Sequence, residues 1–224
     1  MKNLKGFSSS IVVAIDFIPK IGIERMLEIV EKHNLGVKIG LPFFIEIGKD
    51  KIADWLSSYN VYAIADFKLA DIGYVMSLTA KRLRDIGFSA IISHGFVGKK
   101  DALESLREKT IELGLDLYIV SAMSHKGAEE ILNRAFEDII YIVKEVKADG
   151  IIAPATMPEY IKRARLLLGK EFRILSPGIG AQGAKPGDAL RNGADCEIIG
   201  RLITLSDNPE ERIIEIMRIH EGIR

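Results

Sequence analysis

The chain has 224 residues, of which 48% are hydrophobic, so it can bury one substantial core. Its 31 basic and 31 acidic residues are interspersed and cancel, which gives no electrostatic footprint for nucleic acid or an anionic membrane surface. Residues 1–10 lack the apolar core of a signal peptide, and no apolar run approaches the roughly 18 residues of a membrane span. These features predict a soluble, cytoplasmic protein with a single domain over residues 1–224.

Short apolar runs recur along the chain and predict β-strands. Residues 11–16 are rich in β-branched side chains and apolar on both faces, as expected of a parallel strand covered by helices. Seven further runs bring the number of predicted strands to eight, and they lie at residues 37–40, 61–68, 90–94, 117–122, 150–154, 173–176 and 197–200.

Helical periodicity fills the intervals between these runs. Residues 23–33 place Met26, Leu27 and Val30 at helical spacing with charges between them. In the last helix, Asn208 is a capping residue and Pro209 takes the first helical position. Similar patterns predict helices at 71–86, 101–113, 135–146, 157–168 and 208–219.

Eight β-then-α units without a long polar linker favour a closed (β/α)₈ barrel, the TIM-barrel fold. The alternative is a doubly wound open sheet, which is weakened by the absence of a GxGxxG turn after the first strand.

Polar residues gather at the ends of the predicted strands, where barrels of this kind place their chemistry. Strand alternation puts Asp66 and Lys68 on one face, with Ala65 and Phe67 on the other. Because burying unpaired charge is costly, such a set must neutralise itself or bind a charged ligand. The polar residues at or just after strand ends, or within a strand, are Asp16, Lys38, Asp66, Lys68, His94, Ser124 and His125.

Several of these polar residues, together with Asp71 near the start of the third predicted helix, also have structural interpretations. Asp71 could cap the third helix, Lys68 could extend to solvent, and Asp16 could accept hydrogen bonds from its own loop. For His94 the structural interpretation is favoured, namely a hydrogen-bonded histidine at a strand end. The single cysteine, Cys196, is predicted to be a buried apolar thiol.

A glycine-rich segment follows the seventh predicted strand. Residues 176–183 read Ser-Pro-Gly-Ile-Gly-Ala-Gln-Gly, and Gly200-Arg201 follows at the end of the eighth strand. Loops in these two positions often bind phosphate in barrels, and a guanidinium can grip phosphate oxygens in bidentate fashion. The segment therefore predicts a phosphate site and a mobile lid, with a merely flexible loop as the alternative.

The motifs together resemble one enzyme family. Residues 66–72, Asp-Phe-Lys-Leu-Ala-Asp-Ile, are similar to the DxKxxDI signature of the orotidine 5′-monophosphate decarboxylases. Further motifs of that family follow in the same order over nearly the whole chain, at residues 14–16, 37–40, 94–95, 123–125, 176–183 and 200–201.

The resemblance implies roles for individual residues. Lys38, Asp66, Lys68 and Asp71 would form a catalytic array, with Asp71 and the adjacent Ile72 entering the site of a neighbouring subunit in a homodimer. Among the substrate-binding residues, Asp16 and Lys38 would hold the ribose, Ser124 the pyrimidine, and Gln182, Gly200 and Arg201 the phosphate, with Pro177 also in this group.

The resemblance further implies an activity, the conversion of orotidine monophosphate to uridine monophosphate in pyrimidine biosynthesis, with no metal or organic cofactor. Lys68 would stabilise the carbanion left at C6 and then protonate it. Two alternatives remain, a magnesium-dependent sugar-phosphate decarboxylase or aldolase of the same suprafamily, and a non-catalytic nucleotide-binding barrel.

Two positions depart from the family pattern. After Ile72 the family continues with proline and then a ribose-binding threonine, whereas this chain has Gly73-Tyr74-Val75. Val75 has no hydroxyl group, so the ribose contact of the family threonine is not expected here. Met157 replaces an arginine found in some relatives, and no phosphate or lid role is assigned to it.

Overall fold

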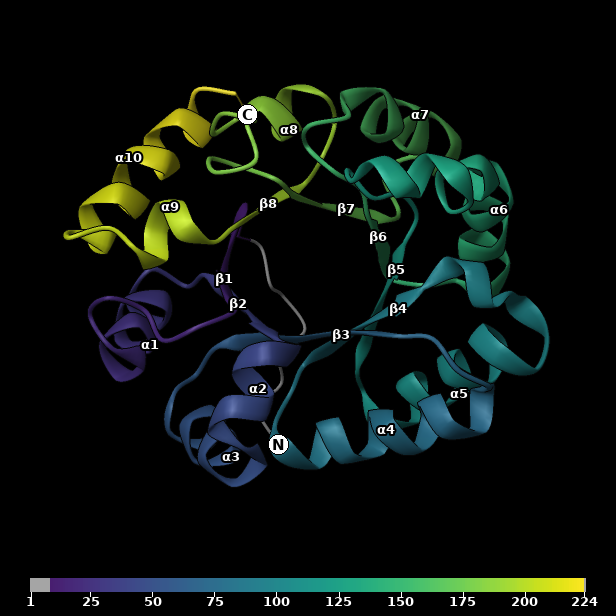
Figure 1. Ribbon diagram of the computed structural model, residues 1–224, viewed down its shortest axis with the longest axis horizontal. Helices are drawn as coiled ribbons and strands as arrows, with labels where there is room; N and C mark the ends of the chain where they lie inside the picture. The colour runs from purple at the N-terminus through teal and green to yellow at the C-terminus, as the bar shows by residue number, and fades with distance from the viewer. Residues whose placement is uncertain (1–8, 224) are drawn as a thin grey trace.

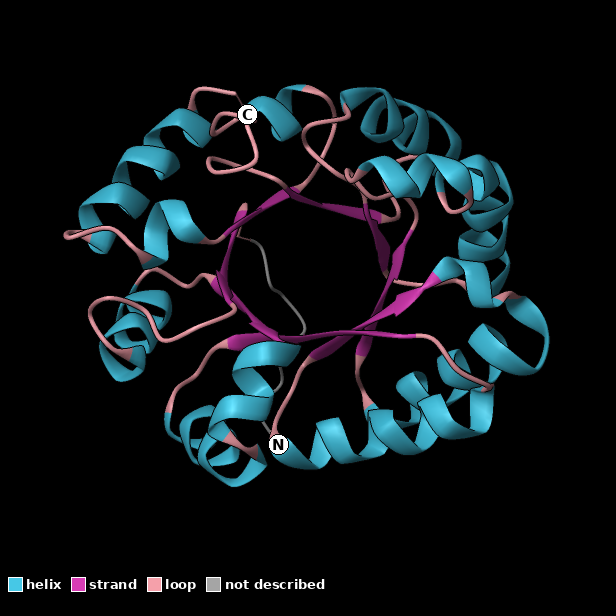
Figure 2. Ribbon diagram, in the orientation of Figure 1, coloured by secondary structure: helices cyan, strands magenta, loops and turns pink. Residues whose placement is uncertain are grey.

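The computed structural model describes residues 9–223, which form a closed barrel of eight parallel strands in sequential order. Figure 1 looks into this barrel, and Figure 2 shows the strands as an inner ring surrounded by helices. The predicted (β/α)₈ fold is therefore confirmed, and the doubly wound alternative is wrong. The strands are β1 (Ile11–Ile15), β2 (Gly36–Gly40), β3 (Tyr62–Leu69), β4 (Ala90–His94), β5 (Asp116–Val120), β6 (Gly150–Ile152), β7 (Arg173–Pro177) and β8 (Cys196–Ile199).

The helices form the outer layer. They are α1 (Ile23–Lys32), α2 (Leu41–Ile47), α3 (Lys49–Ser58), α4 (Gly73–Ile86), α5 (Glu104–Leu113), α6 (Phe136–Val146), α7 (Pro158–Leu168), α8 (Asp188–Arg191), α9 (Arg201–Thr204) and α10 (Pro209–Glu221). Short helical turns add η1 (Gly95–Val97), η2 (Lys99–Leu103), η3 (Lys126–Glu130) and η4 (Asn133–Ala135).

The strands are buried because helices cover the barrel from outside while side chains fill it from inside. All five residues of β1 and of β2 are buried. The outer layer includes large apolar side chains such as Phe43 on α2 and Phe88, both fully buried. This two-sided burial is why the strands read as continuous apolar runs.

Two helices begin two or three residues later than predicted, and one predicted cap does not form. α4 begins at Gly73, two residues later than predicted, and no side chain caps it. α5 begins at Glu104 because Asp101 has a left-handed φ of 56°, which interrupts the helix. Pro209 does occupy the first turn of α10, but the side chain of Asn208 makes no capping hydrogen bond.

A buried polar cluster ties the last elements of the chain to the barrel. The carboxylate of Glu197 on β8 is fully buried and accepts hydrogen bonds from the backbone amides of Gly187 and Ala189, each at 3.0 Å. His220 on α10 contacts the same carboxylate at 2.9 Å, and its other ring nitrogen lies 2.9 Å from the Ser10 hydroxyl. Glu197 thereby holds α8 and α10 against β8.

Within residues 9–223, no helix combines the length and the apolar character needed to cross a membrane.

Candidate active site

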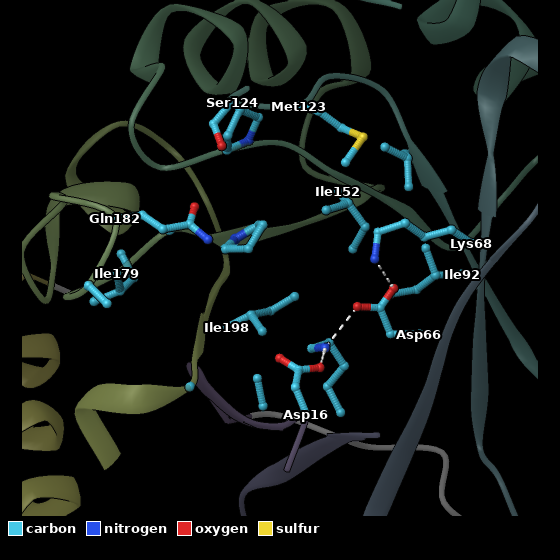
Figure 3. A pocket seen from close by; sticks show the side chains of 18 of the residues that line it. Asp16, Asp66, Lys68, Ile92, Met123, Ser124, Ile152, Ile179, Gln182 and Ile198 are labelled. Carbon is cyan, nitrogen blue, oxygen red and sulfur yellow. Dashed lines mark hydrogen bonds and ion pairs between the residues drawn. The ribbon is translucent and has the colours of Figure 1, made fainter. Parts of the chain in front are cut away.

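A cavity of about 450 Å³ opens at the carboxyl ends of the strands. Its walls come from residues far apart in sequence, which the barrel brings together (Figure 3). Most of the residues singled out from the sequence line it, namely Asp16, Lys38, Asp66, Lys68, Ser124, Pro177, Gln182, Gly200 and Arg201.

An alternating chain of charges lies at one end of this cavity. Asp66 on β3 accepts a hydrogen bond from Lys38 Nζ at 2.8 Å through one carboxylate oxygen, and from Lys68 Nζ at 2.8 Å through the other. Lys38 Nζ also donates to Asp16 Oδ1 at 3.0 Å. The two lysines and two aspartates thus neutralise one another in a place where isolated charges would be costly.

The pKa values in this array move in opposite directions. Burial opposes the charge on Lys38, but the carboxylates of Asp66 and Asp16 outweigh burial and raise the pKa of Lys38. Burial also opposes the charge on Asp66, but Lys38 and Lys68 outweigh it and lower the pKa of that carboxyl. Both partners are therefore held in their charged forms at neutral pH.

β3 aims Asp66 and Lys68 into the cavity, as strand alternation predicts. Between them, Phe67 points outward and packs against Phe44 of α2, with 4.8 Å between ring centroids. The pairing of β3 with β4 shifts register between Ala65 and Leu69, and Lys68 has a left-handed φ of 45°. This conformation costs a non-glycine residue roughly 1–2 kcal/mol, and such strain is characteristic of functional sites.

Gly40, the last residue of β2, allows Asp16 to approach the array. A Cβ atom at Gly40 would lie 1.9 Å from Asp16 Oδ1, a distance at which the two atoms would overlap. Any other residue at this position would displace the Asp16 carboxylate from Lys38. The glycine of the Val37-Lys38-Ile39-Gly40 motif therefore has a steric explanation.

The glycine-rich segment folds back on itself beside the cavity. Gly180 N donates to the carbonyl oxygen of Ala184 at 2.7 Å, and Ala184 N donates to that of Gly178 at 3.3 Å. Gln182 in this segment is exposed and lines the cavity, as does Arg201, which begins α9. Figure 3 shows Gln182 across the cavity from Asp66 and Lys68.

Asp71 and Ile72 lie outside the cavity of their own chain. Both are exposed, and the Asp71 carboxylate accepts a hydrogen bond from the backbone amide of Ile72 at 2.7 Å. The helix-capping interpretation of Asp71 is wrong, because Ile72 is the residue at the cap position of α4.

His94 and Cys196 are the two residues for which structural roles were favoured. His94 Nδ1 is buried without a hydrogen-bond partner among residues 9–223, so the expected hydrogen bond is absent at this atom. Its ring packs instead against Phe96, with 4.7 Å between centroids, and burial followed by the charge of Lys68 lowers its pKa. The burial predicted for Cys196 is confirmed.

Sequence reasoning missed the apolar part of the cavity because it searched strand ends for charge. Strand alternation, which placed Asp66 and Lys68 on one face, also predicts apolar residues of the wall. Ile198, for example, lies two positions before Gly200 and therefore on the same face of its strand. The apolar residues of the wall include Phe17, Ile92, Val120, Ile152 and Ile198.

The closed barrel and the lysine–aspartate array at its carboxyl end define a (β/α)₈-barrel enzyme. A family model described as "Orotidine 5'-phosphate decarboxylase / HUMPS family" matches residues 9–216. The chain belongs to this family.

Similar proteins carry the same name. An orotidine 5′-phosphate decarboxylase of Methanococcoides burtonii is 37% identical over 90% of this chain and 92% of that protein. The crystal structure of the Sulfolobus solfataricus decarboxylase matches with a TM-score of 0.87 at 34% identity, over 96% of this chain and 99% of the other. The crystal structure of the Methanocaldococcus jannaschii decarboxylase, complexed with the inhibitor BMP, matches with a TM-score of 0.82 at 31% identity. This match covers 95% of this chain and 98% of the other. These relatives support the expected carboxy-lyase function over the magnesium-dependent alternative.

Proposed function

We propose that the protein converts orotidine 5′-monophosphate to uridine 5′-monophosphate and carbon dioxide in this cavity. The proposal rests on Asp66, whose carboxylate bridges Lys38 and Lys68 inside the cavity. A cation held by a neighbouring carboxylate suits a reaction in which negative charge develops at one carbon atom. The sequence and structural relatives named above support the choice of substrate.

Lys68 is the proton donor in this mechanism. The bond between C6 and the carboxylate carbon breaks, carbon dioxide leaves, and the electron pair stays on C6. The Lys68 ammonium stabilises this pair and then transfers its proton to C6, after which the neutral amine regains a proton from water. Asp66 keeps the ammonium in place through the 2.8 Å hydrogen bond.

The rest of the cavity holds the non-reacting parts of the substrate. Asp16 and Lys38 bind the ribose hydroxyls, and Ser124, which lies across the cavity from Asp16 in Figure 3, contacts the pyrimidine. The phosphate is bound by Gln182, Gly200 and Arg201, with Pro177 in the same wall. Binding energy from this remote group organises the site and closes the lid.

We propose that two chains form a homodimer that shares Asp71. Asp71 lies outside the cavity of its own chain, although it is only five residues from Asp66, which lies inside that cavity. The chain just after Asp71 carries large exposed apolar side chains, which a second copy would cover. Ile72 is 62% exposed, Tyr74 is 76% exposed, and Leu78 on α4 is 44% exposed.

The cellular location is part of the same proposal. An enzyme that supplies uridine monophosphate for pyrimidine biosynthesis acts on phosphorylated intermediates, so we place it in the cytoplasm.

The decisive assay follows the ultraviolet absorbance of orotidine monophosphate after the purified protein is added. We expect turnover that is unchanged by an excess of chelator, because the proposed mechanism uses no metal ion. Turnover abolished by chelator and restored by Mg²⁺ would favour the metal-dependent alternative. Binding of uridine monophosphate without any turnover of substrate would favour the non-catalytic barrel.

A further inference from the structure

The side chain of Asn133 pairs with both backbone polar groups of Met123, ten residues earlier. Its Oδ1 accepts from Met123 N at 3.0 Å, and its Nδ2 donates to Met123 O at 3.0 Å. Asn133 is the first residue of η4 and is only 5% exposed. The amide therefore takes the place that a neighbouring strand would occupy, just beyond the end of β5.

This pairing fixes the path of the chain from β5 into the cavity. β5 ends at Val120, and the backbone amide of Ser121 donates to the carbonyl oxygen of Ile152 on β6 at 3.1 Å. Two residues later, Asn133 holds Met123. Ser124 comes directly after this second anchor, and both Met123 and Ser124 line the cavity (Figure 3).

A second contact sets the orientation of the Asn133 amide. Its Nδ2 also donates to Glu129 Oε1 at 2.6 Å, so both N–H groups of the amide have acceptors. Tyr160 on α7 approaches the same carboxylate, with its hydroxyl 3.5 Å from each oxygen. With the NH₂ group held in this way, Oδ1 is the atom that faces Met123 N.

We propose that Asn133 is a positioning residue for the pyrimidine end of the substrate. It holds Met123 so that Ser124 reaches the base without rearrangement of the loop, which preorganises this side of the site. The inference rests on the proposed function, in which Ser124 contacts the pyrimidine. A residue that only stabilised the fold would affect all ligands of the cavity alike.

The first test is a cycle of four proteins, namely the parent, Asn133→Ala, Ser124→Ala and the double variant. Each single change should lower kcat/KM for orotidine monophosphate by roughly tenfold, about the effect of one or two lost hydrogen bonds. Because Asn133 acts through the segment that carries Ser124, the two losses should not multiply. The kcat/KM of the double variant should equal that of the more impaired single variant. Multiplied losses would mean that the two residues act independently, which overturns the proposal.

The second test separates positioning from general stability. Uridine monophosphate contains the base, whereas ribose 5-phosphate lacks it. Asn133→Ala should therefore raise the dissociation constant of uridine monophosphate roughly tenfold and leave that of ribose 5-phosphate unchanged. Equal losses for the two ligands would overturn the proposal. Asn133→Asp keeps the side-chain volume but cannot donate to Met123 O, and it should show the same selectivity. This variant replaces Asn133→Ala in the test if the alanine variant folds poorly.

Asn192→Ala is the matched control, because the Asn192 amide donates to the backbone carbonyl of Asp188 at 2.7 Å, away from the cavity. Its kcat/KM should equal that of the parent. If Ser124→Ala retains parental kcat/KM, the proposed pyrimidine contact of Ser124 fails. In that case the comparison of uridine monophosphate with ribose 5-phosphate alone decides whether Asn133 positions the pyrimidine side. That comparison still applies because Met123, which Asn133 holds directly, also lines the cavity.

Discussion

Asp66 holds the charged array together because its two carboxylate oxygens contact different lysines. Its lowered pKa means that the ionised carboxylate stabilises the fold above the ordinary carboxyl range, and this contribution is lost as the pH falls through the folded-state pKa. The raised pKa of Lys38 acts in the opposite sense, so its contribution is present below the ordinary lysine pKa and is lost as the pH rises through the higher folded-state value. Between these limits Lys38 and Asp66 both remain charged, as the proposed mechanism requires.

Replacing Lys68 with alanine removes the proposed proton donor and the cation facing C6. We expect Lys68→Ala to lower kcat by roughly 10³-fold or more, because general acid catalysis alone contributes about 10²–10⁴-fold and the cation facing C6 is lost as well. The absorbance assay measures this loss, and circular dichroism checks that the barrel is intact. Lys162→Ala, a change at an exposed lysine on α7, should behave as the parent. Near-parental activity of Lys68→Ala would refute the mechanism.

At the scale of elements, the loops after β7 and β8 form the proposed phosphate side of the cavity. Arg201→Ala should lower kcat/KM for orotidine monophosphate roughly 100-fold, which corresponds to two charge-assisted hydrogen bonds of about 1.5 kcal/mol each. The same change should leave kcat/KM for orotidine, which has no phosphate, near the parental value. Gln182→Ala should show a smaller loss of the same kind.

Arg218→Ala removes an exposed arginine on α10 and serves as the control for general loss of positive charge. It should change neither substrate's kcat/KM. If Arg201→Ala impairs orotidine and orotidine monophosphate equally, the phosphate assignment is wrong.

The elements α8 and α10 depend on Glu197 for their attachment to β8. Glu197→Ala would leave the amides of Gly187 and Ala189 and the His220 ring without their acceptor in a buried place. We expect a loss of about 3 kcal/mol or more in the free energy of unfolding, since each buried unsatisfied group costs about 1–3 kcal/mol. Urea denaturation measures the loss. Glu197→Gln retains an acceptor oxygen and should be less destabilised, and unchanged stability of Glu197→Ala would contradict this account.

Sequence patterns predicted the order of the elements because parallel strands buried on both faces leave a strong apolar signal. They also placed Asp66 and Lys68 on one face, since alternation is a local property of a strand. The left-handed φ of Lys68 and the register shift of β3 depend on pairing with β4, which no local pattern encodes. Asn133 was missed for a similar reason, because its partner Met123 is ten residues away and is contacted through backbone atoms.

At the scale of the whole molecule, one barrel does not complete the proposed array. Lys38, Asp66 and Lys68 meet in the cavity, whereas Asp71 is exposed outside it. Two copies related by a two-fold axis would exchange equivalent surfaces, so each could insert Asp71 into the other's site. The Lys68→Ala and Asp71→Ala homodimers should then both be nearly inactive, because every site lacks one member of the array.

Refolding an equal mixture of the Lys68→Ala and Asp71→Ala chains should restore activity. In a mixed dimer one site carries both lesions, while the other receives Lys68 from one chain and Asp71 from its partner. Random pairing makes half of the dimers mixed, so recovery should approach about a quarter of the parental activity if the sites act independently. Differently tagged chains recovered together would confirm subunit exchange. If exchange occurs and the mixture stays as inactive as its components, Asp71 does not act across the interface and the shared site is wrong.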